Sequence, residues 1–135
     1  MSLNLKIVTP EKEIYSGEAT QVNIPSEQGE LGILPHHTNL MAKLKPGELT
    51  IKQGEKLTHM AVGDGFFQVG GDALTVMTDL AIDAAYIDEK KVEEAKKRAE
   101  DAMTHTLSEE EHATTLAVLE KSLVQLRVKR KHHVR

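Results

Sequence analysis

Apolar residues recur at every second position through the first part of the chain. Leu3, Leu5 and Ile7 alternate with more polar neighbours, and similar short runs end at Gly, Pro, Asn or Asp about every ten residues. A period of two places one face of each strand in a core and the other face in water. The pattern predicts an antiparallel β-sandwich over residues 1–84. The further runs lie at 22–24, 49–51, 57–62, 66–69 and 74–78.

The spacing of apolar residues changes after residue 79. From Ile87 onward the chain contains no Gly or Pro, and Ala, Glu, Lys, Arg and Leu dominate. Asp88 is placed to cap one helix, and Ser108 with Glu111 three residues later is a capping-box pattern for a second. An antiparallel two-helix hairpin is therefore predicted over 85–135, which makes the chain α+β. The apolar positions at spacings of three and four are Val92, Ala95, Ala99 and Ala102, then Leu116, Leu119, Leu123 and Leu126.

The predicted hairpin has little apolar surface of its own to bury. One stripe is mostly alanine and the other is narrow, and burial contributes only about 25 cal/mol per Å². Ordering the backbone costs about 1–2 kcal/mol per residue. The stripes are expected to pack on each other or on the sandwich, so the hairpin should depend on docking and could open to dock elsewhere.

Composition excludes several classes of protein. The 135 residues suit one domain with an appendage, and a formal net charge of −4 gives no general affinity for polyanions. The absence of Cys excludes disulfides, thiolate metal sites and a cysteine nucleophile. No run approaches the roughly 18 apolar residues of a membrane span, and the N-terminus does not read as a secretion signal. We therefore expect a soluble, cytoplasmic protein.

Basic residues accumulate at the end of the chain, with no acid from residue 121 onward. They can simply complement the dipole of the last helix, or they can form an electrostatic arm that seeks an acidic surface. Nucleic acid is disfavoured as a partner because the rest of the chain is acidic and has no aromatic platform beside the tail. The basic residues are Lys121, Arg127, Lys129, Arg130, Lys131 and Arg135.

The sequence contains no recognisable motif for catalysis or metal binding. The histidine pairs His36-His37 and His132-His133 have no third ligand at a metal-binding spacing, so no metal site is predicted. Gly-x-Ser-x-Gly and Walker-type Gly-Lys-Ser/Thr are absent, and the glycines at 63–65 fail the dinucleotide pattern. The sequence indicates a binding or coupling protein and no catalyst.

The segment GELGILPHH, Gly29 to His37, combines shape and polarity. Its two glycines and Pro35 fix a loop, while Leu31, Ile33 and Leu34 are available for burial. Such a loop presents Glu30 and His37 on a rigid base. We interpret this segment as a surface that contacts a partner protein.

Together with this segment, LNLKIVTPEKEIYSGEA, AVGDGFFQVGGDALTVMTD, IDEKKVEEAKKRAE and LAVLEKSLVQLRV resemble the epsilon subunit of F-type ATP synthases, of bacterial or chloroplast type, over essentially the whole length. The resemblance implies a sandwich followed by a helical hairpin. It also implies a non-catalytic rotor subunit that joins the gamma subunit to the c-ring and couples ATP synthesis to proton or sodium flow. Association with the membrane, on its cytoplasmic face, would then occur only through the complex.

The resemblance also assigns site residues. Glu30, Leu31, Pro35 and His37 would contact gamma or the c-ring, with His36 as an exposed neighbour. The basic arm of Lys121, Arg127, Lys129, Arg130 and Lys131 would meet an acidic segment of a beta subunit when the hairpin extends, and would block ATP hydrolysis. The alternative is a structural linker whose hairpin stays docked.

Some relatives bind ATP through Ile/Leu-Asp-x-x-Arg-Ala, which makes an ATP sensor a further alternative. The matching residues here are Ile87, Asp88, Lys91 and Val92, with Lys121 and Gln125 aligned to arginines of the second helix. Lysine offers a point charge in place of a planar fork, and valine is bulkier than alanine. Weak or absent ATP binding is therefore expected, and no other cofactor.

Overall fold

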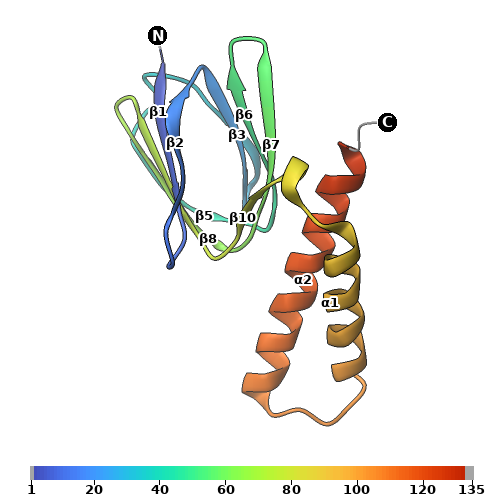
Figure 1. Ribbon diagram of the computed structural model, residues 1–135. Helices are drawn as coiled ribbons and strands as arrows, with labels where there is room; N and C mark the ends of the chain where they lie inside the picture. The colour runs from blue at the N-terminus through green and yellow to red at the C-terminus, as the bar shows by residue number, and fades with distance from the viewer. Residues whose placement is uncertain (1, 133–135) are drawn as a thin grey trace.

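The computed structural model describes residues 2–132 and places ten strands before two helices (Figure 1). This order confirms the α+β prediction. The strands are β1 Leu3–Val8, β2 Glu13–Ala19, β3 Gln21–Ser26, β4 Gly29–Ile33, β5 Leu40–Leu44, β6 Gly47–Gln53, β7 Lys56–Val62, β8 Gly65–Gly70, β9 Ala73–Thr78 and β10 Ala81–Asp83. The helices are the short 3-10 helix η1 Ala84–Tyr86, then α1 Glu89–Ala102 and α2 Glu109–Lys131.

The strands follow one hydrogen-bonded path that folds into two layers. Its order is β10-β7-β6-β3-β5-β8-β9-β1-β2, with β4 paired to β3 beside the path. In Figure 1, β3, β6 and β7 face β1, β2 and β8 across the interior. Neighbouring strands of the described chain run antiparallel, except that β1 and β9 are parallel. The predicted sandwich is confirmed, and the parallel pair is an addition that alternation alone does not indicate.

The core is built from the alternating positions. Leu3, Leu5 and Ile7 are buried, as are the matching positions of the other runs. Phe67 is 0% exposed at the centre, whereas its neighbour Phe66 is 52% exposed on the outer face. This contrast is what a period of two requires.

Both predicted helix caps are present. Asp88 Oδ1 accepts the Lys91 N–H at 3.2 Å. The Ser108 hydroxyl accepts the Glu111 N–H at 3.1 Å, and the Glu111 carboxylate accepts the Ser108 N–H at 3.0 Å. The hydrogen bond from the Ser108 backbone lowers the pKa of Glu111. Each helix therefore begins where its cap predicts.

The predicted leucine stripe of α2 is only partly correct. Leu126 is buried, but Leu116 and Leu123 are 38% and 43% exposed. Val124 and Val128 are buried instead. The reason is that the second half of α2 contacts both α1 and the sandwich, which buries a different and wider arc than a helix with one partner buries.

The hairpin is attached to the sandwich near one end. Figure 1 shows the loop between α1 and α2 at the end farthest from the strands, while the last turns of α2 approach β7 and η1. Within residues 2–132, no helix has the length and apolar character to cross a membrane.

Candidate functional site

The GELGILPHH segment was predicted to be a loop, but its first five residues form strand β4, which pairs with β3, and only the remainder is a turn. Glu30 is exposed on β4, and its neighbour Leu31 is partly buried against the core, because successive strand residues point to opposite faces. Ile33 is fully buried. Leu34, which we expected to be available for burial, is about half exposed because it lies beyond the end of the strand.

The turn after β4 is held by Asp72, a residue that no sequence motif indicated. His36 has a φ of 63°, which is unusual for a non-glycine residue. Its N–H donates to Asp72 Oδ1 at 2.7 Å, and its Nδ1 lies 3.2 Å from the same oxygen. Asp72 therefore anchors the turn, and partly buried Pro35 and His37 lie on either side of His36. His37 Nδ1 is 2.7 Å from the Thr38 carbonyl oxygen.

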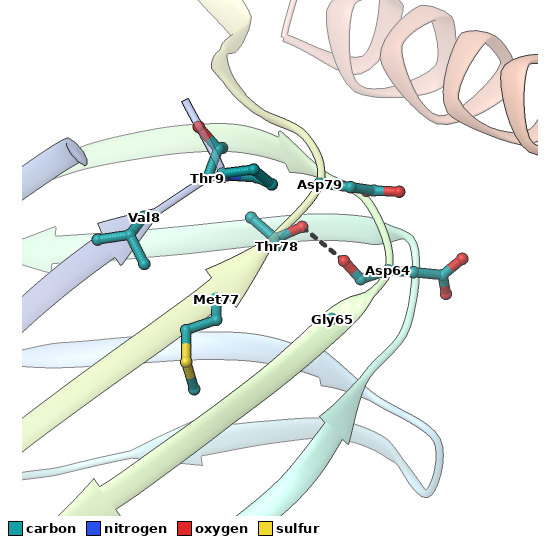
Figure 2. A pocket seen from close by; sticks show the side chains of 8 residues that line it. Val8, Thr9, Asp64, Gly65, Met77, Thr78 and Asp79 are labelled. Atoms are coloured by element: carbon teal, nitrogen blue, oxygen red, sulfur yellow. Dashed lines mark hydrogen bonds between the residues drawn. The ribbon is translucent and has the colours of Figure 1, made fainter. Parts of the chain in front are cut away.

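A shallow hollow lies where β8 begins and β9 ends, at the end of these strands away from Asp72 (Figure 2). The Thr78 hydroxyl donates to the Asp64 carbonyl oxygen at 3.0 Å and fixes this corner. The hollow of about 380 Å³ is mostly apolar and has no converging set of polar groups, so it does not form a binding site with chemical specificity. Its lining residues are Val8, Thr9, Pro10, Asp64, Gly65, Met77, Thr78 and Asp79.

The basic arm is engaged with acids of the same chain. Lys121 Nζ lies 3.1 Å from Asp79 Oδ2 at the end of β9. Arg130 donates from Nε to Glu89 at 2.8 Å and from Nη2 to Glu93 at 2.5 Å, both on α1. These two hydrogen bonds raise the pKa of Arg130. The arm thus joins α2 to both the sandwich and α1.

Two further residues of the arm face the sandwich side. Lys129 Nζ donates to the Ala84 carbonyl oxygen at 3.1 Å, and Lys131 Nζ lies 3.5 Å from Glu48 Oε2. Arg127 is exposed on the remaining face of α2. Arg135 and His133 lie outside the described residues.

An apolar docking patch joins the hairpin to the sandwich. It consists of Ala61 on β7, Ala84 in η1, Ile87 before α1, and Val124 and Val128 on α2. Ala61 lies between two core residues of β7 and therefore on the outer face of the strand, where α2 buries it completely. Three consecutive buried residues in β7 are possible because both faces of this strand are covered.

A cluster of one acid and two histidines borders the docking patch. His132 Nε2 lies 2.6 Å from Glu48 Oε1, and His59 Nδ1 lies 3.6 Å from Glu48 Oε2. The rings of His59 and His132 stack with centroids 3.6 Å apart and planes at 11°. Glu48, His59 and His132 are named the His-Glu cluster below.

Burial and charge set the pKa values in the His-Glu cluster. Burial alone would raise the pKa of Glu48, but the hydrogen bond and charge of His132, with the charge of Lys131, outweigh it and hold this pKa below its ordinary value. Burial, helped by the charge of His132, lowers the pKa of His59. The acid is thus held ionised, and His59 favours the neutral ring. The sequence search missed the cluster because its members come from β6, β7 and the end of α2.

The residues aligned with an ATP-binding motif have structural roles. Ile87 is buried in the docking patch, and Asp88 caps α1. Lys91 is exposed on α1. Ile87 and Asp88 therefore have reasons to be present that need no nucleotide.

Known proteins resemble this chain over nearly its full length. The family model of the ATP synthase Delta/Epsilon chain beta-sandwich domain matches residues 2–84. The ATP synthase epsilon chain of Herminiimonas arsenicoxydans is 40% identical over 128 residues, which cover 93% of this chain and 91% of the relative. The chain belongs to the ATP synthase epsilon chain family. The resemblance found in the sequence is thereby confirmed, and the protein is a subunit of ATP synthase. The epsilon chain of Vesicomyosocius okutanii subsp. Calyptogena okutanii (strain HA) is 38% identical over 127 residues, 94% of this chain and 92% of that one.

Solved structures share the fold. A chain in the Euglena gracilis mitochondrial ATP synthase, OSCP/F1/c-ring, superposes with a TM-score of 0.75 at 21% identity, covering 98% of this chain and 82% of the other. A chain in the Tetrahymena thermophila mitochondrial ATP synthase central stalk/c-ring gives 0.63 at 13% identity, covering 99% and 98%. At these identities the likeness is one of fold.

Proposed function

We propose that this epsilon chain is a non-catalytic rotor subunit that links gamma to the c-ring through its sandwich. Its hairpin inhibits ATP hydrolysis when it leaves the sandwich and reaches a beta subunit. Membership in the family supports the first part, and so does a shared fold with chains from F1/c-ring and central-stalk assemblies. Such a subunit would be a peripheral protein on the cytoplasmic face of the membrane.

The pairing of the basic arm is the observation that carries the inhibitory part. Lys121, Arg130 and Lys131 are held against acids of their own chain. Exposed ion pairs contribute only about 0–1 kcal/mol each. An acidic surface on a beta subunit can therefore take over these residues at little cost.

The small docking patch supports a hairpin that can leave. Its α2 contribution consists mainly of Val124 and Val128, set against Ala61 and Ala84, whose side chains are single methyl groups. At about 25 cal/mol per Å², so small a contact holds the docked state by a modest margin. A permanently docked hairpin would call for a larger apolar interface.

Deletion of residues 107–135 from the chain in the complete ATP synthase should raise ATP hydrolysis several-fold. The reason is that the docking patch and basic arm are removed while the sandwich keeps its own core. ATPase activity of the purified complex measures the effect. Co-purification of the truncated chain with gamma is the control for assembly. Unchanged ATPase activity in an assembled complex would contradict inhibition, and failure of the full chain to bind gamma would contradict the rotor assignment.

Glu30→Ala and His37→Ala should weaken assembly or rotary coupling. Both residues lie on the anchored GELGILPHH segment, and neither side chain belongs to the core, so the free energy of unfolding should change by no more than about 0.5 kcal/mol. ATP-driven ion pumping by the reconstituted complex measures coupling. Glu55→Ala, an exposed acid in the β6–β7 turn, is the matched control. Equal coupling in all three variants would remove Glu30 and His37 from the interface.

We also propose that ATP binding is weak or absent. Lys91 offers one ammonium group at the position of an arginine fork, and Lys121 is paired with Asp79. The inhibitory hairpin is then controlled mainly by its partners and not by nucleotide.

A further inference from the structure

We propose that Glu48, His59 and His132 form a binding site for a divalent transition metal ion of the zinc type. The site lies at the joint between the sandwich and the end of α2. Metal binding itself does not depend on the function proposed above.

The geometry of the His-Glu cluster suits one ion. One ligand atom from each of the three side chains lies within 4.8 Å of the others. Ligands at about 2.0–2.1 Å from a tetrahedral zinc ion lie roughly 3.4 Å apart. The separations of 2.6 Å from His132 Nε2 to Glu48 and 3.6 Å from His59 Nδ1 to Glu48 lie on either side of that value. The two rings, which now stack with planes at 11°, would have to rotate so that both ligand nitrogens point at the same ion, and the cluster could then close around it.

The donor set is chemically appropriate. Two imidazoles and one carboxylate are typical zinc ligands, and they leave a fourth position for water. A cavity of about 570 Å³ that includes His59 and His132 in its lining gives this water room. A bound ion would replace the proton between His132 and Glu48 and displace the ammonium of Lys131 from the carboxylate.

The surroundings orient two of the ligands. The Thr50 hydroxyl donates to Glu48 Oε2 at 3.3 Å and lies 3.3 Å from His59 Nδ1, a contact that an ion bound to this nitrogen would replace. Thr50 is paired with His59 across β6 and β7, so its position is fixed by the sheet. Glu48 and His59 are thus held on rigid strands, and His132 is the ligand that arrives with the hairpin.

This division of ligands gives the ion a consequence. An ion held by two sandwich residues and one α2 residue binds the docked hairpin and stabilises it by mass action. Under the proposed function, which this step alone requires, zinc would keep the inhibitory hairpin away from the beta subunit.

The test is calorimetric titration of zinc into the full chain. We expect one ion per chain. His59→Asn, His132→Asn and Glu48→Gln should each lower the apparent affinity by at least the 10–100-fold that is typical even for outer-shell partners. His112→Asn removes an exposed histidine of α2 outside the cluster and should retain the wild-type affinity.

Wild-type affinity in His59→Asn or Glu48→Gln would overturn the proposal, because the ion would then be bound by the chain end alone. A second measurement needs no variant. In the wild-type chain, zinc should shift the side-chain NMR signals of both His59 and His132. A shift at His132 without one at His59 would equally overturn the site, whatever the ATPase experiments show.

Discussion

Gly65→Ala should destabilise the sandwich by about 4–5 kcal/mol, at the extreme of single-substitution effects. A Cβ on Gly65 would lie 1.9 Å from the Met77 carbonyl oxygen and 2.8 Å from the Thr78 Cα. Both are backbone atoms of β9, the strand hydrogen-bonded to β8 at this point, so neither can move away like a flexible side chain. Figure 2 shows Gly65 beside these residues at the corner of the hollow. Because domains are stable by only about 5–15 kcal/mol, such a loss removes from roughly a third to nearly all of the free energy of unfolding.

Urea unfolding followed by circular dichroism measures this effect. The matched control is Gly54→Ala in the β6–β7 turn, where φ is +63° but no atom lies within 4 Å of the added Cβ. That variant should lose only the roughly 1–2 kcal/mol of a left-handed backbone. Equal losses of unfolding free energy in the two variants would show that the β9 backbone moves to accommodate a Cβ at Gly65, and would contradict a rigid strand contact there.

The sandwich could be predicted because each strand repeats the same local rule. Leu3, Leu5 and Ile7 are buried for the reason that their spacing indicates, and the helix caps at Asp88 and Ser108 act within three residues. The parallel pairing of β1 with β9 joins two strands that are far apart in the sequence, and no local pattern specifies it. Leu116 was predicted to be buried but is exposed. Periodicity indicates that a helix has an apolar face, whereas the part of the helix that is buried depends on its packing partners.

The partners of the candidate site residues could not be predicted from local sequence patterns. The basic arm is visible in the sequence because its charges are clustered with no acid among them, yet the acids that pair with it lie on β6, just after β9 and on α1. His132 was considered with its chain neighbour, whereas its partner Glu48 is 84 residues away. Glu48 and His59 share a face of the β6–β7 hairpin, a relation that register predicts once the hairpin is known.

Ala61→Asp should release the hairpin from the sandwich. Ala61 is fully buried under α2, and an unpaired buried charge costs about 3–5 kcal/mol. The new carboxylate would also lie directly across from Glu48, the cross-strand partner of Ala61, and like charges in that position repel. The burial cost disappears when α2 leaves, because the outer face of β7 then meets water, which also screens the repulsion from Glu48.

Distances between spin labels measure the release. The chain contains no cysteine, so labels at Lys52→Cys on β6 and Glu120→Cys on α2, both exposed positions, report on the sandwich and hairpin alone. Ala61→Asp should broaden and lengthen the distance distribution. Leu57→Asp is the matched control, since Leu57 is on the same face of the same strand but is already 52% exposed. Identical distributions in the two variants would mean that the docking patch does not hold α2.

Release of the hairpin by Ala61→Asp should also change the rate of ATP hydrolysis. Under the proposed inhibitory role, Ala61→Asp should lower ATP hydrolysis in the complete ATP synthase, because more hairpins would be free to place Arg127 and the rest of the basic arm on a beta subunit. Deletion of residues 107–135 in the same chain should then restore hydrolysis, since no arm remains to inhibit. If the activity stays low after the deletion, the loss arises in the sandwich and the inhibitory role of the hairpin is contradicted. Restoration by the deletion therefore separates a released inhibitor from a damaged rotor contact.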